Sequence, residues 1–102
     1  LQKAMARALE AVDLYVTPAG SAPSITWTNL TGHPTLITRC GKTDRGLPVS
    51  VEFTGQLYRE DAILRAAFAY ERATAWHREW PDLSRLPATP PPLNQTSSEA
   101  EE

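Results

Sequence analysis

The chain has 102 residues, and its ten basic and twelve acidic side chains give a formal net charge of −2. The two signs are interspersed except at the acidic end, so no basic strip exists to follow a phosphate backbone, which argues against nucleic-acid binding. No apolar run approaches the ~18 residues of a membrane-spanning helix, and the first residues lack the order of a signal peptide. Cys40 is the single cysteine, so no internal disulfide can form, and we expect a cytoplasmic protein without a membrane partner.

The N-terminal region predicts a helix followed by a strand. Residues 1–11 are rich in strong helix formers, and we interpret them as the last turns of a helix. Residues 13–17 are short and β-prone, and Pro18 and Gly20 end them, which predicts a buried strand. Because the helical pattern begins at Leu1 and not at a Met, we expect sequence to be missing upstream.

The middle of the chain predicts a loop and then a hairpin. Residues 20–25 are small and predict a loop, and residues 26–30 predict a single helical turn before Gly32 breaks it. Residues 35–40 and 49–54 predict two antiparallel strands, because both are β-prone and a polar connection with turn residues joins them.

A long amphipathic helix is predicted from Glu60 to Arg78, ended by Pro81, because apolar residues recur there at three- and four-residue spacing. The apolar faces of the second hairpin strand and of this helix predict one shared layer, formed by Val49, Val51, Phe53, Ile63, Ala67 and Tyr70. We divide the chain into a folded segment, residues 1–83, and a Pro-rich and acidic tail, residues 84–102, that we expect to be disordered. So few elements make a marginal fold, as expected for part of a larger sheet.

Three motifs in a fixed order carry a family resemblance. They are residues 29–34 (NLTGHP), Cys40-Gly41 followed by residues 46–49 (GLPV), and residues 58–74 (YREDAILRAAFAYERAT). In order and spacing they closely resemble the C-terminal end of the amidase-signature enzymes, a family of small-amide hydrolases and glutamyl-tRNA amidotransferase A subunits. The resemblance implies an α/β segment, the C-terminal fragment of a mixed sheet flanked by helices.

The resemblance also implies an activity and its partners. Enzymes of this family hydrolyse a carboxylic amide C–N bond through an acyl-enzyme, using a Ser, a bridging Ser held by a cis peptide, and a Lys. All three lie upstream of the part that this chain resembles, so we expect no catalytic residue, no cofactor and no activity in the chain alone. The implied partners are a small-molecule amide and the remainder of the amidase domain, and a homo-oligomer stays open. Two alternatives remain: a component that resembles the A subunits of tRNA-dependent amidotransferases, and a non-catalytic remnant that binds a partner.

The resemblance places the chain just before Asn29 beside the acyl-binding pocket. Ser21, Ala22 and Trp27 are therefore the candidate substrate-binding residues, and a loop that only covers the sheet is an equal alternative. Ala22 falls near the position at which glutamine-using A subunits have an aspartate that holds the substrate's amino group, which argues against a glutaminase. Arg39 replaces the family's usual proline before Cys-Gly.

Other chemistry-bearing residues support simpler interpretations. His33, Cys40 and His77 are isolated and form no paired metal-ligand motif, so we expect no metal site. A role as a small apolar residue at the end of a strand explains Cys40 better than a role as a nucleophile. The three tryptophans lie near arginines, but the charge balance favours helix packing over base stacking.

Overall fold

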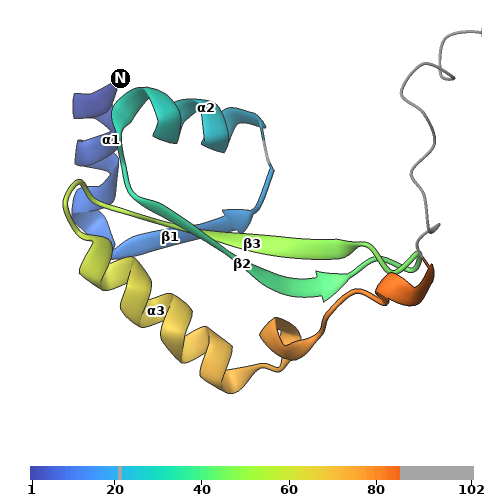
Figure 1. Cartoon of the computed structure of the whole chain (residues 1–102). Coiled ribbons are helices and arrows are strands. Elements are labelled where there is room, and N and C mark those ends of the chain that lie inside the picture. The colour runs from blue at the N-terminus through green and yellow to red at the C-terminus, as the bar shows by residue number, and fades with distance from the viewer. Residues whose placement is uncertain (21, 86–102) are drawn as a thin grey trace, which may run out of the picture.

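The computed structural model describes residues 1–20 and 22–85, which fold as helices on both sides of a small sheet (Figure 1). Its helices are α1 (Gln2–Ala8), α2 (Ala22–Thr31) and α3 (Glu60–Ala73), with shorter 3-10 turns η1 (Leu9–Ala11), η2 (Trp76–Arg78) and η3 (Leu83–Arg85). Its strands are β1 (Leu14–Pro18), β2 (Thr35–Lys42) and β3 (Pro48–Gly55). The expected α/β class is confirmed. None of these helices combines the length and the apolar character needed to cross a membrane.

The sheet has the order β1-β3-β2, and both strand pairs are antiparallel. The predicted hairpin is therefore confirmed as β2 and β3, and the register shifts between Arg39 and Gly41, which leaves Cys40 as the extra residue of a bulge. The prediction of a buried first strand is wrong, because β1 pairs with β3 alone and leaves Val16 exposed. Within the described residues, β1 and β2 are thus both edge strands.

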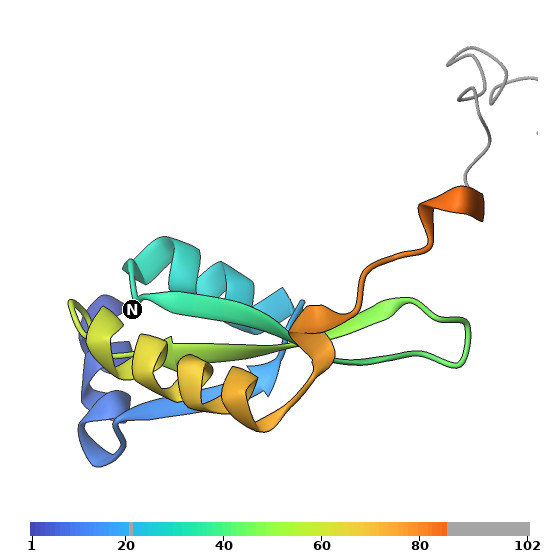
Figure 2. The ribbon, with the colours of Figure 1, turned by 60° about the horizontal axis from the view of Figure 1, so that its bottom comes forward.

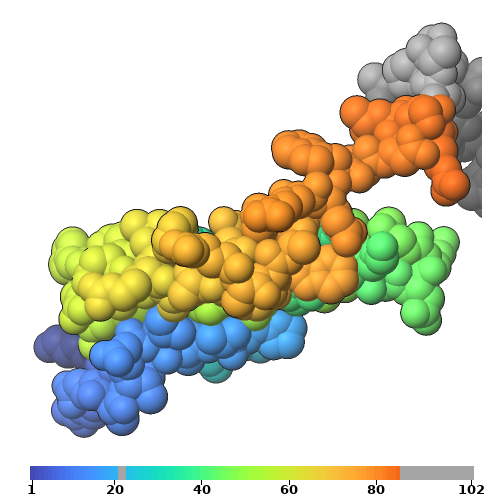
Figure 3. All heavy atoms as spheres, turned by 90° about the horizontal axis from the view of Figure 1, so that it is seen from below, coloured from blue at the N-terminus to red at the C-terminus, as the bar shows by residue number. Residues whose placement is uncertain are grey.

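The apolar layer lies between the sheet and α3, which covers one face (Figure 2). Phe53, Ile63 and Ala67 are buried, and Leu14, Leu36, Val51, Ala66 and Tyr70 pack against them. The rings of Phe53 and Tyr70 meet with centroids 5.9 Å apart and planes tilted by 58°. The predicted layer is therefore confirmed except at Val49, which is exposed because the hairpin extends beyond the end of α3 (Figure 3).

The segment predicted as a loop with one helical turn is instead the ten-residue helix α2, on the sheet face opposite α3 (Figure 1). Its threonine hydroxyls donate to carbonyls one turn earlier: Thr28 Oγ1 to Ser24 O at 3.1 Å, and Thr31 Oγ1 to Trp27 O at 2.8 Å. Gly32 ends the helix with a φ of 76°, a conformation that glycine adopts at little cost. The sequence does not reveal the helix because small polar residues give it no apolar stripe.

The helix α3 ends at Ala73 and not at Arg78, so the predicted helix is five residues too long. Thr74 is extended, with φ −129° and ψ 168°, and its hydroxyl donates to Tyr70 O at 3.0 Å. The residues that continue the apolar spacing form the separate turn η2, and Pro81 has no part in ending the helix. Of the predicted tail, Ser84 and Arg85 lie in η3, and residues 86–102 lie outside the described residues.

Candidate functional site

The segment predicted to bind substrate lies at the start of α2. Ser21 is outside the described residues, and Ala22 is the first residue of the helix. Trp27 lies further along the same helix, and its side chain is 48% exposed. The structure therefore brings Ala22 and Trp27 onto one helix. Their role in substrate binding stays a prediction.

A layer of buried polar side chains lies between α2 and the sheet, and we call it the polar layer. Its members are Ser24, Thr28 and Thr31 of α2, His33 of the following turn, and Glu52 and Thr54 of β3. Successive residues of a strand point to opposite faces, so Glu52 and Thr54 face α2 while Phe53 faces α3. The buried side chains that α2 and β3 present to each other are thus hydrogen-bonding groups.

Glu52 is the charged residue of the polar layer and is only 1% exposed. Its Oε1 accepts a hydrogen bond from Ser24 Oγ at 3.2 Å, whereas its Oε2 has no partner. Thr17 lies directly opposite Glu52 in the β1–β3 register, and its Oγ1 is also buried without a partner. A buried carboxylate oxygen without a donor costs folding free energy. Glu52 therefore occupies a site whose hydrogen bonding the described residues do not complete.

His33 is buried at the C-terminal end of α2, with its Nδ1 2.7 Å from Thr31 Oγ1. The Thr31 hydroxyl already donates its one proton to Trp27 O, so at this contact it accepts and Nδ1 is the donor. The Nε2 atom has no partner. Among residues 1–20 and 22–85, no three His, Cys, Asp or Glu side chains lie close enough to hold a metal ion. The bond from Nδ1 links His33 to Thr31, the last residue of α2.

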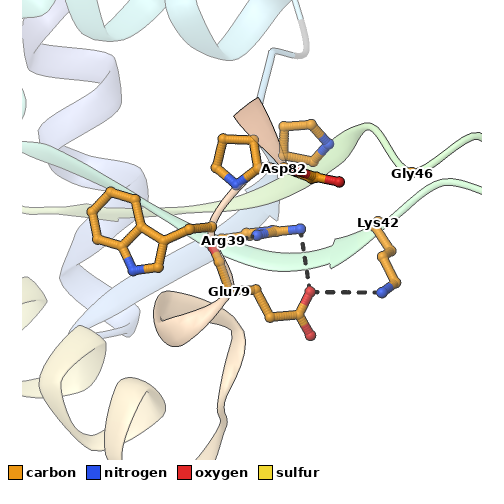
Figure 4. Close-up of a pocket in the computed structure, with 8 residues that line it drawn as sticks. Arg39, Lys42, Gly46, Glu79 and Asp82 are labelled. Carbon is orange, nitrogen blue, oxygen red and sulfur yellow. Dashed lines mark hydrogen bonds and ion pairs between the residues drawn. The ribbon is translucent and has the colours of Figure 1, made fainter. Parts of the chain in front are cut away.

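A cavity of about 360 Å³ lies between the hairpin and the chain after α3 (Figure 4). Arg39 and Lys42 of β2 point toward Glu79 there: Arg39 Nη2 and Lys42 Nζ lie 3.5 and 3.7 Å from Glu79 Oε2. Arg39 also donates from Nη1 to Glu79 O at 2.9 Å and from Nε to Gly41 O at 3.3 Å. Because both cations already face a carboxylate, this cavity is a structural junction and a poor site for an anion.

Two exposed carboxylates accept hydrogen bonds that change pKa values. Hydrogen bonds from Arg59 to Asp61, at 2.8 and 3.2 Å, lower the pKa of Asp61 and raise that of Arg59. Hydrogen bonds from the Ser84 hydroxyl and backbone N–H lower the pKa of Asp82. Asp61 lies in the first turn of α3, where a negative charge suits the helix dipole. Asp82 lines the cavity of Figure 4, and both pairs are exposed and stabilise local structure.

The sequence does not identify Ser24 and Glu52 as buried residues of the polar layer. In the sequence, Glu52 alternates with Val51 and Phe53 and so belongs to the other, polar face of its strand. The available signal is the spacing of Ser24, Thr28 and Thr31, which are four and three residues apart and share one helical face. A polar helix face opposite a polar strand face indicates a buried polar interface.

Comparisons with known proteins identify relatives of the chain. No family model matches it, and no solved structure matches it. Glutamyl-tRNA(Gln) amidotransferase A subunits are similar to it: that of Nostoc punctiforme is 37% identical over 82 residues, which are 80% of this chain and 16% of the relative. That of Acaryochloris marina is 37% identical over 81 residues, 79% of this chain and 16% of the relative.

A third relative with the same name, from a Picosynechococcus species, is 46% identical over 55 residues, 54% of this chain and 11% of the relative. The chain thus spans about one sixth of the length of these relatives and corresponds to their C-terminal part. The motifs at residues 29–34, 46–49 and 58–74 agree with this placement. On this homology, the chain belongs to the amidase-signature family, as a relative of the C-terminal part of its glutamyl-tRNA(Gln) amidotransferase A subunits.

Proposed function

We propose that the chain is the C-terminal part of an enzyme that hydrolyses a carboxylic amide C–N bond. The homology to A subunits of the amidase-signature family is the observation that carries this proposal. In the complete protein, a Ser activated by a Lys through a bridging Ser would form the acyl-enzyme, and the three residues would lie upstream of this chain. The partners would be a small amide substrate and the remainder of the amidase domain, in the cytoplasm.

The side chains of the polar layer support a structural and not a nucleophilic role for this segment. Ser24 is buried, and its hydroxyl donates to a carboxylate. The hydroxyls of Thr28 and Thr31 donate to backbone carbonyls of their own helix. An acyl-transfer nucleophile needs access to substrate and a base within hydrogen-bond reach. We infer that this segment builds one wall of the substrate site and leaves the chemistry to residues elsewhere.

A second candidate function is that of an amidotransferase A subunit, which uses glutamine as the amide. The names of the relatives favour it. Ala22 favours a simple amide, because its short apolar side chain cannot hold a substrate's amino group as the aspartate near this position does in glutamine-using A subunits. We therefore rank simple-amide hydrolysis first.

The test compares the chain alone with the parent protein, which is this chain joined to its upstream sequence. A panel of simple amides and glutamine is offered to both, and ammonia release is measured. We expect the parent to turn over simple amides and to prefer them to glutamine. We expect no turnover by the chain alone, because loss of a nucleophile or its base costs several orders of magnitude in rate.

Three other outcomes would contradict this proposal. A parent protein that releases ammonia only from glutamine, and only with other subunits present, would establish the second candidate. A parent protein inactive on every amide would favour a non-catalytic remnant. Activity in the short chain that is lost on Ser24→Ala or Cys40→Ala would show that the chemistry lies within these residues.

A further inference from the structure

We propose that residues 74–82, the segment after α3, form a strap that closes the free edge of β2 and keeps the sheet from pairing with a second copy of the chain. The free edge is the side of β2 away from β3, which no strand of the described residues occupies. An open edge presents unpaired N–H and C=O groups and is a template for another strand. This role is separate from amide hydrolysis and does not depend on it.

The backbone groups at the free edge of β2 follow from its pairing with β3. Gly55 N donates to Pro34 O at 3.1 Å, one residue pair before the start of the β2–β3 register. Bonded and non-bonded residue pairs alternate along an antiparallel ladder, so Leu36 and Thr38 are the next residues of β2 that bond to β3. The residues between and after them direct their N–H and C=O groups to the free edge. They are Thr35, Ile37 and Arg39.

The strap crosses this edge and is fastened there by Arg39. Thr38 Oγ1 donates to Glu71 Oε1 at 3.3 Å, so Thr38 lies on the sheet face that α3 covers. Arg39 follows it in the strand and points to the other face. Its Nη1 nevertheless donates to Glu79 O at 2.9 Å, and its Nη2 lies 3.5 Å from Glu79 Oε2 (Figure 4). These contacts join the two faces around the edge of β2, and η2 packs against the same strand.

The strap decides how much of the edge can pair. With Glu79 bound at Arg39, the open stretch is residues 35–37, which is at the short limit of strand lengths. Release of the strap would lengthen the stretch to residues 35–39, close to the usual length of a strand. Beyond it, the register shift at Cys40 interrupts the ladder. Ile37, in the middle of the stretch, is 56% exposed and would add apolar contact to such a pairing.

The opposite edge of the sheet is closed by a different device. Ala19 N donates to Ser50 O at 3.0 Å, so the same alternation along β1 turns every second residue away from β3. The residues at the free edge of β1 are Leu14, Val16 and Pro18. A proline has no N–H to offer, so it ends this short edge. The strand β2 has no proline, and the strap takes its place there.

The test measures self-association of the whole chain by sedimentation velocity. All variants carry Phe68→Ser, because exposed Phe68 on α3 offers a separate contact surface. For Arg39→Ala we expect the self-association constant to rise about tenfold or more, as one or two further backbone hydrogen bonds between copies imply. The rise would depend on loss of the strap, since the edge groups of β2 themselves are unchanged.

The matched control is Lys42→Ala, which removes a second cation from the same carboxylate. Lys42 Nζ lies 3.7 Å from Glu79 Oε2 and its side chain is exposed, so the bonds of Arg39 should still hold the strap. We expect its self-association constant to stay within about twofold of the reference. Either substitution removes one positive charge and changes the net charge from −2 to −3, so net charge cannot explain a difference between them.

Hydrogen exchange shows where the copies meet. In Arg39→Ala, the amides of Thr35 and Ile37 should exchange more slowly when the chain associates than when it is dilute, because they gain partners at the edge. The amides of Leu36 and Thr38 should not change, since they already bond to β3. Adding Ile37→Lys should return the self-association constant to the reference value, because a charged side chain on an edge strand opposes pairing.

Three results would overturn the strap. They are an unchanged self-association constant in Arg39→Ala, an equal rise in Lys42→Ala, and a rise without slower exchange at Thr35 and Ile37. Should Arg39→Ala fail to fold, Arg39→Lys decides the question, because lysine keeps the charge but lacks the planar fork that holds both oxygens of Glu79. A rise in Arg39→Lys would support the strap, and an unchanged constant would overturn it.

Discussion

Gly55, the last residue of β3, shows how closely the sheet approaches α3. A Cβ at this position would lie 2.9 Å from Ile63 Cγ2 and 3.5 Å from Arg59 O. Ile63 belongs to the buried cluster and has little room to move. We expect Gly55→Ala to destabilise the β3–α3 contact by ~1–3 kcal/mol, the usual cost of overpacking.

The control for this prediction is Gly41→Ala in β2, where a Cβ would meet no atom within 4 Å. Its effect should stay within ~0.5 kcal/mol, as for most surface substitutions. Native-state hydrogen exchange of the β3 and α3 amides in the parent protein measures both variants. Equal exchange rates in Gly55→Ala and Gly41→Ala would show that the Ile63 side chain can move aside without a cost in free energy.

Single residues also show the limits of prediction from the sequence. Gly32 and Gly46 are correctly predicted as turn positions, and both have a positive φ. Glycine adopts that conformation at no steric cost, so the residue type alone is informative. The sequence does not predict the burial of Glu52, because strand alternation shows which residues share a face and not whether the polar face is covered. Its burial depends on α2, which is far from it in the sequence.

The segment after α3 is an element held by one arginine. Arg39 bonds both the backbone oxygen and the carboxylate of Glu79, whereas Lys42 makes one contact of 3.7 Å from an exposed side chain. We expect Arg39→Ala to raise the hydrogen-exchange rates of residues 76–80 by about three- to tenfold, as the loss of charge-assisted bonds implies. Lys42→Ala should change them by less than about twofold, because exposed ion pairs contribute little. Equal effects of the two variants would show that general electrostatic attraction, and not the bonds of Arg39, holds this segment.

Whether an element is predictable depends on what its residues pack against. The hairpin and the core of α3 bury apolar residues at the spacing of their own secondary structure, and both predictions are confirmed. The helix α2 packs through hydroxyls, so its apolar residues give no periodic signal. The predicted end of α3 is misplaced because the apolar spacing continues past Thr74, whose extended backbone breaks the helix. A local change of dihedral angles leaves the spacing of residue types intact.

Viewed as a whole, the described molecule exposes apolar surface on α3. Leu64 and Phe68 are exposed there and line a cavity of about 170 Å³ with Leu36, Ala67 and Glu71. With edge strands on both sides of the sheet, such a surface favours association in an isolated chain. We expect the chain alone to form concentration-dependent oligomers in sedimentation velocity, and Phe68→Ser to weaken them.

The comparison variant for association is Leu83→Ser. Leu83 is 66% exposed and Phe68 61%, but Leu83 lies in the turn η3 and not on α3. The Leu83→Ser variant should leave the sedimentation profile unchanged, because one isolated apolar side chain adds little to a contact surface. A monomeric wild-type chain at every concentration would contradict the expectation.

The central place of β3 in the sheet also constrains the order in which the chain folds as it leaves the ribosome. The strand β1 is synthesised first, but its described partner is β3, which follows α2 and β2. The hairpin and α3, by contrast, are consecutive in the chain and share the buried cluster, so their contacts close short loops. A nascent chain can therefore complete the unit of β2, β3 and α3 without its first strand. Within this segment, we expect the strand made first to be the last to join the sheet.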